Sequence, residues 1–278
     1  MIWLMAMAFI ASGVGGVLGM ASGIFLVPLL TIAAGQPIHA AIGLSLISVI
    51  CCSCASAPLY LKAGLTNIRL AVVLETATTA GAVAGVLCSG LLPTRVLYLL
   101  FAMVLLLSAL QMAGKRTIAP TMARARGRLA STLDGSYRDE AGRQQSYQIA
   151  RLPLGLSMMF GAGLLSALLG IGSGVLKIPA MDKALRLPIK VSSATSNFMI
   201  GVTAAAGATG YFLSGMIDLA RAGPICLGSV AGSVAGAAAL RAVHPGRLRG
   251  FFVLVLLLLA AAMLAIAFGG APTLLASS

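Results

Sequence analysis

Long apolar blocks separated by short polar turns constrain this sequence more than any other feature. Several blocks exceed the roughly 20 helical residues that cross ~30 Å of hydrocarbon, and none shows the short alternating segments of a membrane β-barrel. Only 9% of the residues are charged, too few to cover a water-soluble domain of 278 residues. The sequence therefore predicts an all-α integral membrane protein. The eight apolar blocks lie at about residues 1–34, 38–61, 70–92, 96–113, 152–180, 191–214, 222–240 and 250–269.

A polar, basic segment at 114–151 separates four apolar blocks from the other four. Its centre, "RARGRLASTLDGSYRDEAGRQQ", predicts a mobile cytoplasmic linker whose basic face could contact anionic lipid. The chain is thereby divided into a first transmembrane repeat at 1–113, the linker, and a second transmembrane repeat at 152–278. The net charge of +13 gathers in the loops, as the positive-inside rule expects, so we predict a lipid environment and no nucleic-acid partner.

The two halves repeat one another. The stretch "GMASGIFLVP", which begins at Gly19, returns 151 residues later as "GIGSGVLKIP", which begins at Gly170. The same offset joins further small residues and helix breakers, and internal repeats of this kind are typical of transporters. The matching pairs include Ser22 with Ser173, Pro28 with Pro179, Ser45 with Ser196, Tyr60 with Tyr211, Gly81 with Gly232 and Gly85 with Gly236.

Loop charge predicts how the halves are related. If every block crossed once, the basic turns at 181–190 and 241–249 would lie outside, against the positive-inside rule. If the first block of each half is broken and returns, both turns face the cytoplasm together with the linker. Block 1–34 would also span ~50 Å as one helix, which is longer than a crossing needs. We therefore expect two inverted-topology repeats, about ten membrane segments, and both termini outside.

Each Gly-x-x-Ser-Gly break is followed by the start of a half-helix. Free N–H groups and the positive end of the helix dipole attract anions there. Glycine lets a ligand approach the backbone, and a serine hydroxyl can cap the helix or bind substrate. We therefore predict one central anion site that contains Ser22, Gly23, Ser173 and Gly174. The alternative is that these residues only permit close helix packing, the role that we assign to the Gly-x-x-x-Gly pairs elsewhere in the chain.

A second polar group occupies matching places in the two halves. It consists of Ser45 in the first half and of Thr195, Ser196 and Asn197 in the second. Uncharged hydroxyl and amide groups suit an anion that must bind and then leave, so these residues are predicted to bind substrate. The alternative is that each hydroxyl bonds a carbonyl of its own helix.

Ionisable residues inside the apolar blocks are few, and each is a functional candidate by default. Lys177 lies in the first turn of the second half-helix, where its repeat partner is Leu26. It either pairs with the anion or extends to the cytoplasmic surface. Glu75 is a candidate for proton coupling, and the alternative is an ion pair with Lys62 or Arg69.

Metal and enzyme chemistry find little support in the sequence. Only two histidines are present, His39 and His244, and the five cysteines fall within apolar blocks, so we expect no metal and no cofactor. An intramembrane serine protease would need the motif Gly-x-Ser-Gly. The position of its first glycine is held by Met20 in the first half and by Ile171 in the second. An intramembrane enzyme is therefore the weaker alternative. A passive anion channel and a scaffold remain open.

The doubled arrangement resembles the sulfite exporter TauE/SafE family. The residues that carry the resemblance are "GMASGIFLVP" with "GLSL" and "GIGSGVLKIP" with "ATSN", within two four-block halves and around a basic central loop. The first half departs from the pattern, because its glycine run is thinned and Leu44 replaces the threonine of a Thr-Ser pair. The resemblance implies proton-coupled export of a small sulfur-containing or organic anion, such as sulfite, a sulfonate or sulfoacetate, across the bacterial inner membrane. A monomer and a homodimer are both compatible with it.

Overall fold

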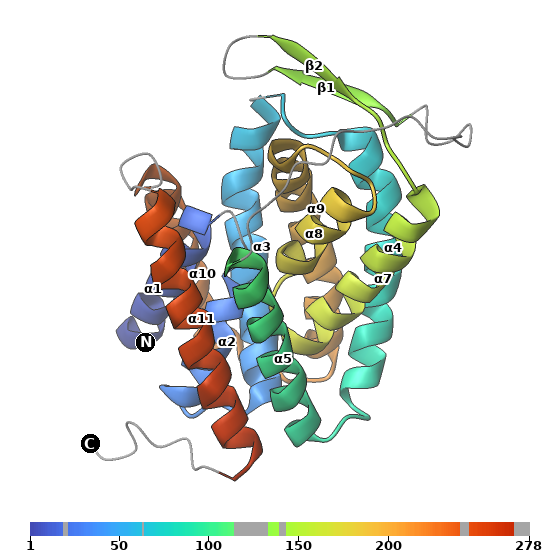
Figure 1. The fold of residues 1–278 in the computed structure, drawn as a ribbon. Coiled ribbons are helices and arrows are strands. Elements are labelled where there is room, and N and C mark those ends of the chain that lie inside the picture. The colour runs from blue at the N-terminus through green and yellow to red at the C-terminus, as the bar shows by residue number, and fades with distance from the viewer. Residues whose placement is uncertain (19–21, 63, 114–132, 139–142, 240–244, 270–278) are drawn as a thin grey trace.

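The computed structural model describes residues 1–18, 22–62, 64–113, 133–138, 143–239 and 245–269, and this part of the chain is mostly helical (Figure 1). The first-half helices are α1 (Ile2–Leu18), α2 (Gly23–Ile32), α3 (Ile38–Lys62), α4 (Ile68–Ser89) and α5 (Thr94–Ala113). A hairpin of β1 (Gly135–Arg138) and β2 (Gln144–Tyr147) follows. The second-half helices are α7 (Leu152–Leu169), α8 (Gly174–Lys183), α9 (Ile189–Leu213), α10 (Leu219–Ala239) and α11 (Pro245–Ala267).

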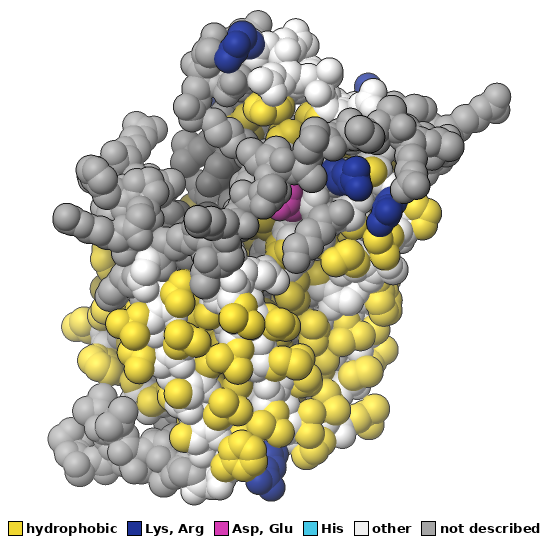
Figure 2. Space-filling model, in the orientation of Figure 1, with side chains coloured by type: hydrophobic (Ala, Val, Ile, Leu, Met, Phe, Trp, Pro, Cys, Tyr) yellow, Lys and Arg dark blue, Asp and Glu magenta, His cyan; other side chains and the backbone are white. Residues whose placement is uncertain are grey.

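Several of these helices have the length and composition of membrane spans. Within the described ranges, four segments qualify fully: Ile38–Pro58, Ile68–Ser89, Thr94–Gln111 and Leu152–Leu169. Large apolar side chains also remain on the outside, for example Leu87, Leu110 and Leu227, and a hydrophobic band covers the middle of the face in Figure 2. Such a surface suits lipid and not water. The expectation of a helical membrane protein is confirmed, while the depth and direction of each segment stay predictions.

The first apolar block of each half is interrupted at the motif. Helix α1 ends at Leu18 and α2 begins at Gly23, while α7 ends at Leu169 and α8 begins at Gly174. The second interruption has left-handed backbone at Gly170 (φ 66°) and Gly172 (φ 69°), a conformation that glycine adopts without a steric penalty. Gly170 thereby ends α7 with its N–H donating to the Ser166 carbonyl. Residues 19–21 of the first motif lie outside the described residues.

Helix boundaries recur at the offset found in the sequence. The bounds of α2 and α8 differ by 151 residues at both ends, and so do the bounds of α3 and α9. The most extensive helix contacts join the two halves, α1 with α10 and α4 with α7. Because α1 corresponds to α7 and α10 to α4 at this offset, the two contacts are equivalent.

Glycines bring these helix pairs into backbone contact. A Cβ atom added to Gly81 of α4 would lie 2.0 Å from the Phe160 carbonyl oxygen of α7. At the equivalent contact, a Cβ on Gly232 of α10 would lie 2.2 Å from the Phe9 carbonyl oxygen of α1. Gly85 and Gly236 make the next contacts along the same two faces. The Gly-x-x-x-Gly pairs therefore have the packing role that their spacing predicts.

Side-chain and backbone contacts group the turns at two ends of the bundle. At one end, Asn67 contacts Tyr147 of the hairpin, and the Ala150 N–H donates to the Leu185 carbonyl. At the other end, Arg221 donates to Gln36. The hairpin and the C-terminal end of α11 lie at opposite ends of the molecule (Figure 1).

Part of the segment between α5 and α7 forms a hairpin that its composition does not predict. Helix α5 ends at Ala113 and α7 begins at Leu152, and within this connection β1 and β2 pair antiparallel. The hairpin is held by apolar contacts at the bundle end: Tyr147 and Ile149 are buried with Leu70 and Leu185. Residues 114–132 and 139–142, which contain most of the basic cluster, lie outside the described residues.

A glycine substitution tests the close packing of α4 and α7. A Cβ at Gly163 would lie 2.0 Å from the Thr78 carbonyl oxygen, which cannot move without separating the helices. We expect Gly163→Ala to destabilise the protein by about 1–3 kcal/mol or more, measured as thermal unfolding in detergent. The matched control is Gly161→Ala on the same helix, where a Cβ meets nothing within 4 Å. Equal melting temperatures for the two variants would contradict the packing described.

Candidate functional site

The predicted serines occupy the first position of each half-helix, but neither hydroxyl caps it. Ser22 precedes α2 and Ser173 precedes α8, both with helical backbone angles and with no side-chain cap. Their carbonyls accept the first hydrogen bonds of the helices, from the N–H groups of Leu26 (3.0 Å) and Lys177 (2.8 Å). The free N–H groups at both helix starts therefore have no serine hydroxyl bound to them.

The start of α2 packs against the second break. A Cβ on Gly23 would lie 2.2 Å from the Gly170 carbonyl oxygen and 2.8 Å from the Ser45 hydroxyl. Ser45 donates a hydrogen bond of 2.7 Å to that same Gly170 carbonyl. Three elements that are distant in sequence thus meet through small residues and one hydroxyl. Of the predicted site residues, Gly23 and Ser45 lie together here.

The start of α8 is lined by other predicted residues. A Cβ on Gly174 would lie 2.6 Å from Ile200 Cδ1 and 3.6 Å from the Ser196 hydroxyl. The hydroxyls of Ser173 and Ser196 are fully buried and have no hydrogen-bond partner in the described part of the chain. Leaving a buried hydroxyl unpaired costs about 1–3 kcal/mol. The two hydroxyls are therefore unpaired polar groups next to the start of α8.

Thr195 and Asn197 take part in contacts away from the start of α8. The Thr195 hydroxyl accepts a hydrogen bond of 3.2 Å from the Asn67 N–H, at the hairpin end of the bundle. The backbone carbonyl of Asn197 accepts one of 2.7 Å from the Ser53 hydroxyl. Both contacts join the first half of the chain to α9. Their sequence neighbour Ser196 is the member of this group that lies beside Gly174.

The two ionisable candidates pair with each other. Lys177 Nζ lies 3.0 Å from Glu75 Oε2, the lysine is fully buried, and the glutamate side chain is 12% exposed. Lys177 also donates to the Thr203 hydroxyl at 2.6 Å, and that hydroxyl donates to Glu75 Oε1. Lys177 therefore does not extend to the surface, and the partner of Glu75 is neither of the basic residues considered from the sequence. Two opposite charges, each isolated in an apolar block, were the signal that could have predicted this pair.

A neutral polar cluster surrounds Ser22 at the start of α2. Its hydroxyl lies 2.8 Å from that of Ser48, which in turn lies 2.6 Å from Ser229 and 3.5 Å from Ser12. The Cys52 thiol donates to the Ser22 hydroxyl at 3.5 Å. Sequence reasoning identified Ser22 alone, because the other members are small polar residues spread over three helices, α1, α3 and α10.

The neutral cluster and the charged cluster occupy positions that the repeat relates, and each combines residues of both halves. At the 151-residue offset, Leu26 corresponds to Lys177 and Cys52 corresponds to Thr203. On the partner helices α4 and α10, Glu75 corresponds to Cys226, and Thr78 to Ser229. The ion pair joins α4 of the first half to α8 of the second, and the related positions on α2 and α10 carry no charge.

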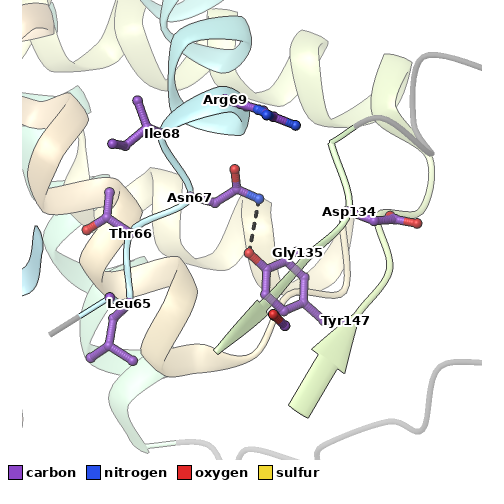
Figure 3. Close-up of a pocket in the computed structure, with 10 residues that line it drawn as sticks. Leu65, Thr66, Asn67, Ile68, Arg69, Asp134, Gly135 and Tyr147 are labelled. Carbon is purple, nitrogen blue, oxygen red and sulfur yellow. Dashed lines mark hydrogen bonds between the residues drawn. The ribbon is translucent and has the colours of Figure 1, made fainter. Parts of the chain in front are cut away.

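A separate polar pocket of about 280 Å³ lies between the turn after α3 and the hairpin (Figure 3). Asn67 Nδ2 donates to the Tyr147 hydroxyl at 3.0 Å and to the Leu133 carbonyl at 2.9 Å. Burial raises the pKa of Tyr147, the nearby Asp134 charge raises it further, and the Asn67 hydrogen bond acts in the opposite direction. Tyr147 therefore stays a neutral phenol that holds the hairpin against the bundle.

Metal-binding side chains do not cluster. Cys51 and Cys54 have the spacing of a Cys-x-x-Cys pair but lie within α3. Among the described residues, no group of three or more His, Cys, Asp or Glu side chains could hold a metal ion.

A double substitution tests the buried ion pair. Lys177→Met leaves the Glu75 carboxylate without its cation, so we expect a loss of about 3–5 kcal/mol in the free energy of unfolding. Glu75→Gln combined with Lys177→Met removes both charges and should recover most of that loss. Denaturation of the purified variants in detergent measures the difference. A double variant no more stable than Lys177→Met would contradict a direct pair.

Comparisons with known proteins assign the chain to a family. The family model described as sulfite exporter TauE/SafE matches residues 4–263. The probable membrane transporter protein YunE of Bacillus subtilis (strain 168) is 26% identical over 263 residues, which cover 92% of this chain and 94% of the relative. The probable membrane transporter protein YdhB of the same organism is 25% identical over 222 residues, covering 80% and 83%. No solved structure matches the chain. Together with the apolar helices and their paired breaks, this match shows that the chain belongs to the sulfite exporter TauE/SafE family of multi-pass membrane transporters.

Proposed function

We propose that the protein exports a small sulfur-containing or organic anion across the bacterial inner membrane, by alternating access around the starts of α2 and α8. The observation that carries the proposal is the contact of the α2 start with the break before α8, through Gly23, Ser45 and Gly170. Each helix start contributes roughly half a positive charge from its dipole. The α2 start packs at the break that begins four residues before Gly174, so the positive ends of both helices bear on this region and favour an anion.

The chemistry around the α8 start supports an oxygen-rich anion as the substrate. Ser173 and Ser196 offer buried hydroxyls without partners in the described part of the chain, and Lys177 on the first turn supplies a cation. Hydroxyl donors and an ammonium group suit the oxygens of a sulfite, sulfonate or carboxylate. The family is described as one of sulfite exporters, and sulfite belongs to this class.

The inverted relation of the halves is part of the proposal. It is supported by the recurring helix bounds, by the equivalent α1–α10 and α4–α7 contacts, and by the turns that gather at each end. The basic turns at 62–69 and 181–190 belong to the hairpin end, which we assign to the cytoplasm. Transporters built from inverted repeats alternate by rocking one part against the other around a fixed midplane site.

Two cysteine substitutions test this orientation. Ser214→Cys lies in the exposed turn after α9, which we expect outside, and Ser136→Cys lies on the exposed hairpin, which we expect in the cytoplasm. In intact cells, a membrane-impermeant thiol reagent should label the first variant and reach the second only after the membrane is permeabilised. The unsubstituted protein, with its five native cysteines, gives the background. The reverse labelling pattern would overturn the orientation.

Substitutions at the α8 start test the site. In liposomes that contain the purified protein, Gly174→Leu should abolish uptake of sulfite, thiosulfate, a sulfonate or a small carboxylate, because leucine fills the space beside Ile200 and Ser196. Ser173→Ala should weaken the apparent affinity about tenfold, since a hydrogen bond to a charged group contributes roughly 1.5 kcal/mol.

The matched control for the site is Gly223→Leu on α10, an exposed position where a Cβ meets nothing within 4 Å. It should leave transport unchanged. Normal transport by Gly174→Leu would show that the substrate does not bind at the α8 start. Flux that follows the anion gradient alone, without counterflow, would instead indicate a passive channel.

A further inference from the structure

The Lys177 ammonium is engaged before any substrate arrives. Its partners are the Glu75 carboxylate at 3.0 Å and the Thr203 hydroxyl at 2.6 Å, and Lys177 is fully buried. The pair is neutral as a unit. An anion that approached Lys177 while Glu75 is ionised would bring a net negative charge into an apolar interior, which is strongly unfavourable.

A proton on Glu75 removes this obstacle. The carboxyl group becomes neutral, Lys177 keeps its positive charge, and the anion takes the place of the carboxylate as the partner of the ammonium. The total buried charge is then unchanged for a singly charged anion. By thermodynamic linkage, the proton and the anion each bind better when the other is present.

The surroundings of Glu75 suit a group that gains and loses a proton. Its side chain is 12% exposed, whereas Lys177 is closed off, so the carboxyl is the member of the pair that is not fully enclosed by the protein. Thr203 from α9 and Thr78 and Thr79 from its own helix place hydroxyls beside the carboxyl oxygens. These hydroxyls can donate to the carboxylate or accept from the protonated form.

The neighbouring helices contribute no competing charge in the described ranges. On α8 the group facing Glu75 is Lys177, and on α9 it is the neutral Thr203. Helix α7, which packs along α4, contains no ionisable side chain. Arg69, on the first turn of α4, is exposed at the helix end. The positions that the repeat relates to Lys177 and Glu75 hold Leu26 and Cys226, so they form no second ion pair.

From these contacts, and resting on the proposed function, we infer that the protein is a symporter in which one proton on Glu75 accompanies each anion bound at Lys177. No covalent step is involved: the proton enters at Glu75 on one side and leaves with the anion on the other. An exported anion therefore carries a proton out with it. For a singly charged anion the exchange moves no net charge across the membrane.

The experiment uses an anion whose own protonation does not change in the neutral pH range. Wild-type protein in liposomes with a trapped pH dye is given radiolabelled methanesulfonate, or thiosulfate, on the outside. We expect the lumen to acidify as the anion enters. The apparent affinity for methanesulfonate should fall by up to about tenfold for each unit rise in pH, the limit for one linked proton.

The Glu75→Gln variant separates the inference from a merely structural role. A neutral amide leaves Lys177 charged and free, so methanesulfonate binding should persist, lose its pH dependence and move no protons. A purely structural pair would give less folded protein with an unchanged ratio of protons to anions. The combined Glu75→Cys and Lys177→Leu variant copies the repeat-related residues Cys226 and Leu26, and it should fold without binding the anion.

The outcomes distinguish the two proposals. If the wild-type protein moves neither these anions nor sulfite, the proposed function fails. If it moves methanesulfonate while the lumen becomes alkaline or stays unchanged, the symport inference fails and the proposed function stands. Retained pH dependence in Glu75→Gln would also overturn the inference, because the linked proton would then bind elsewhere.

Discussion

A helix that breaks within an apolar surrounding exposes backbone groups that water cannot satisfy, and the protein itself must cover them. The break before α8 is covered in this way: the Gly170 carbonyl accepts the Ser45 hydroxyl, and Gly23 allows the start of α2 to approach it closely. The glycine contacts of α4 with α7 fix the helix that ends at this break. The position of the candidate site therefore follows from where the surrounding protein can cover the backbone groups of a broken helix.

The two halves share one helix arrangement, and the side chains at repeat-related positions differ in charge. The neutral cluster around Ser48 and the charged cluster around Thr203 occupy equivalent positions, yet one is a set of hydroxyls and a thiol while the other contains a buried ion pair. A buried pair adds little stability compared with apolar packing and is costly to break. The pair joins Glu75 of the first half to Lys177 of the second, whereas the positions related to them by the repeat hold Cys226 and Leu26.

Apolar periodicity and helix breakers predicted much of the fold from the sequence. The breaks, the helix boundaries around Gly23 and Gly174, and the packing role of the glycine pairs follow from local rules of backbone conformation and helix contact. The pairing of Glu75 with Lys177 could not be predicted in the same way, since it depends on how α4 and α8 lie in space. The hairpin was missed for a related reason: its strands are polar, and they are stabilised by burial of Tyr147 and Ile149 against the bundle.

The contacts of Asn67 restrain the hairpin and α9 at this end of the bundle. One residue joins the turn after α3 to the hairpin through Tyr147 and to α9 through Thr195. A connection that only tethered the halves would let them separate freely at this end. Asn67 is instead hydrogen-bonded to both the hairpin and α9, so α9 cannot move away from this turn without breaking the bond between Asn67 and Thr195.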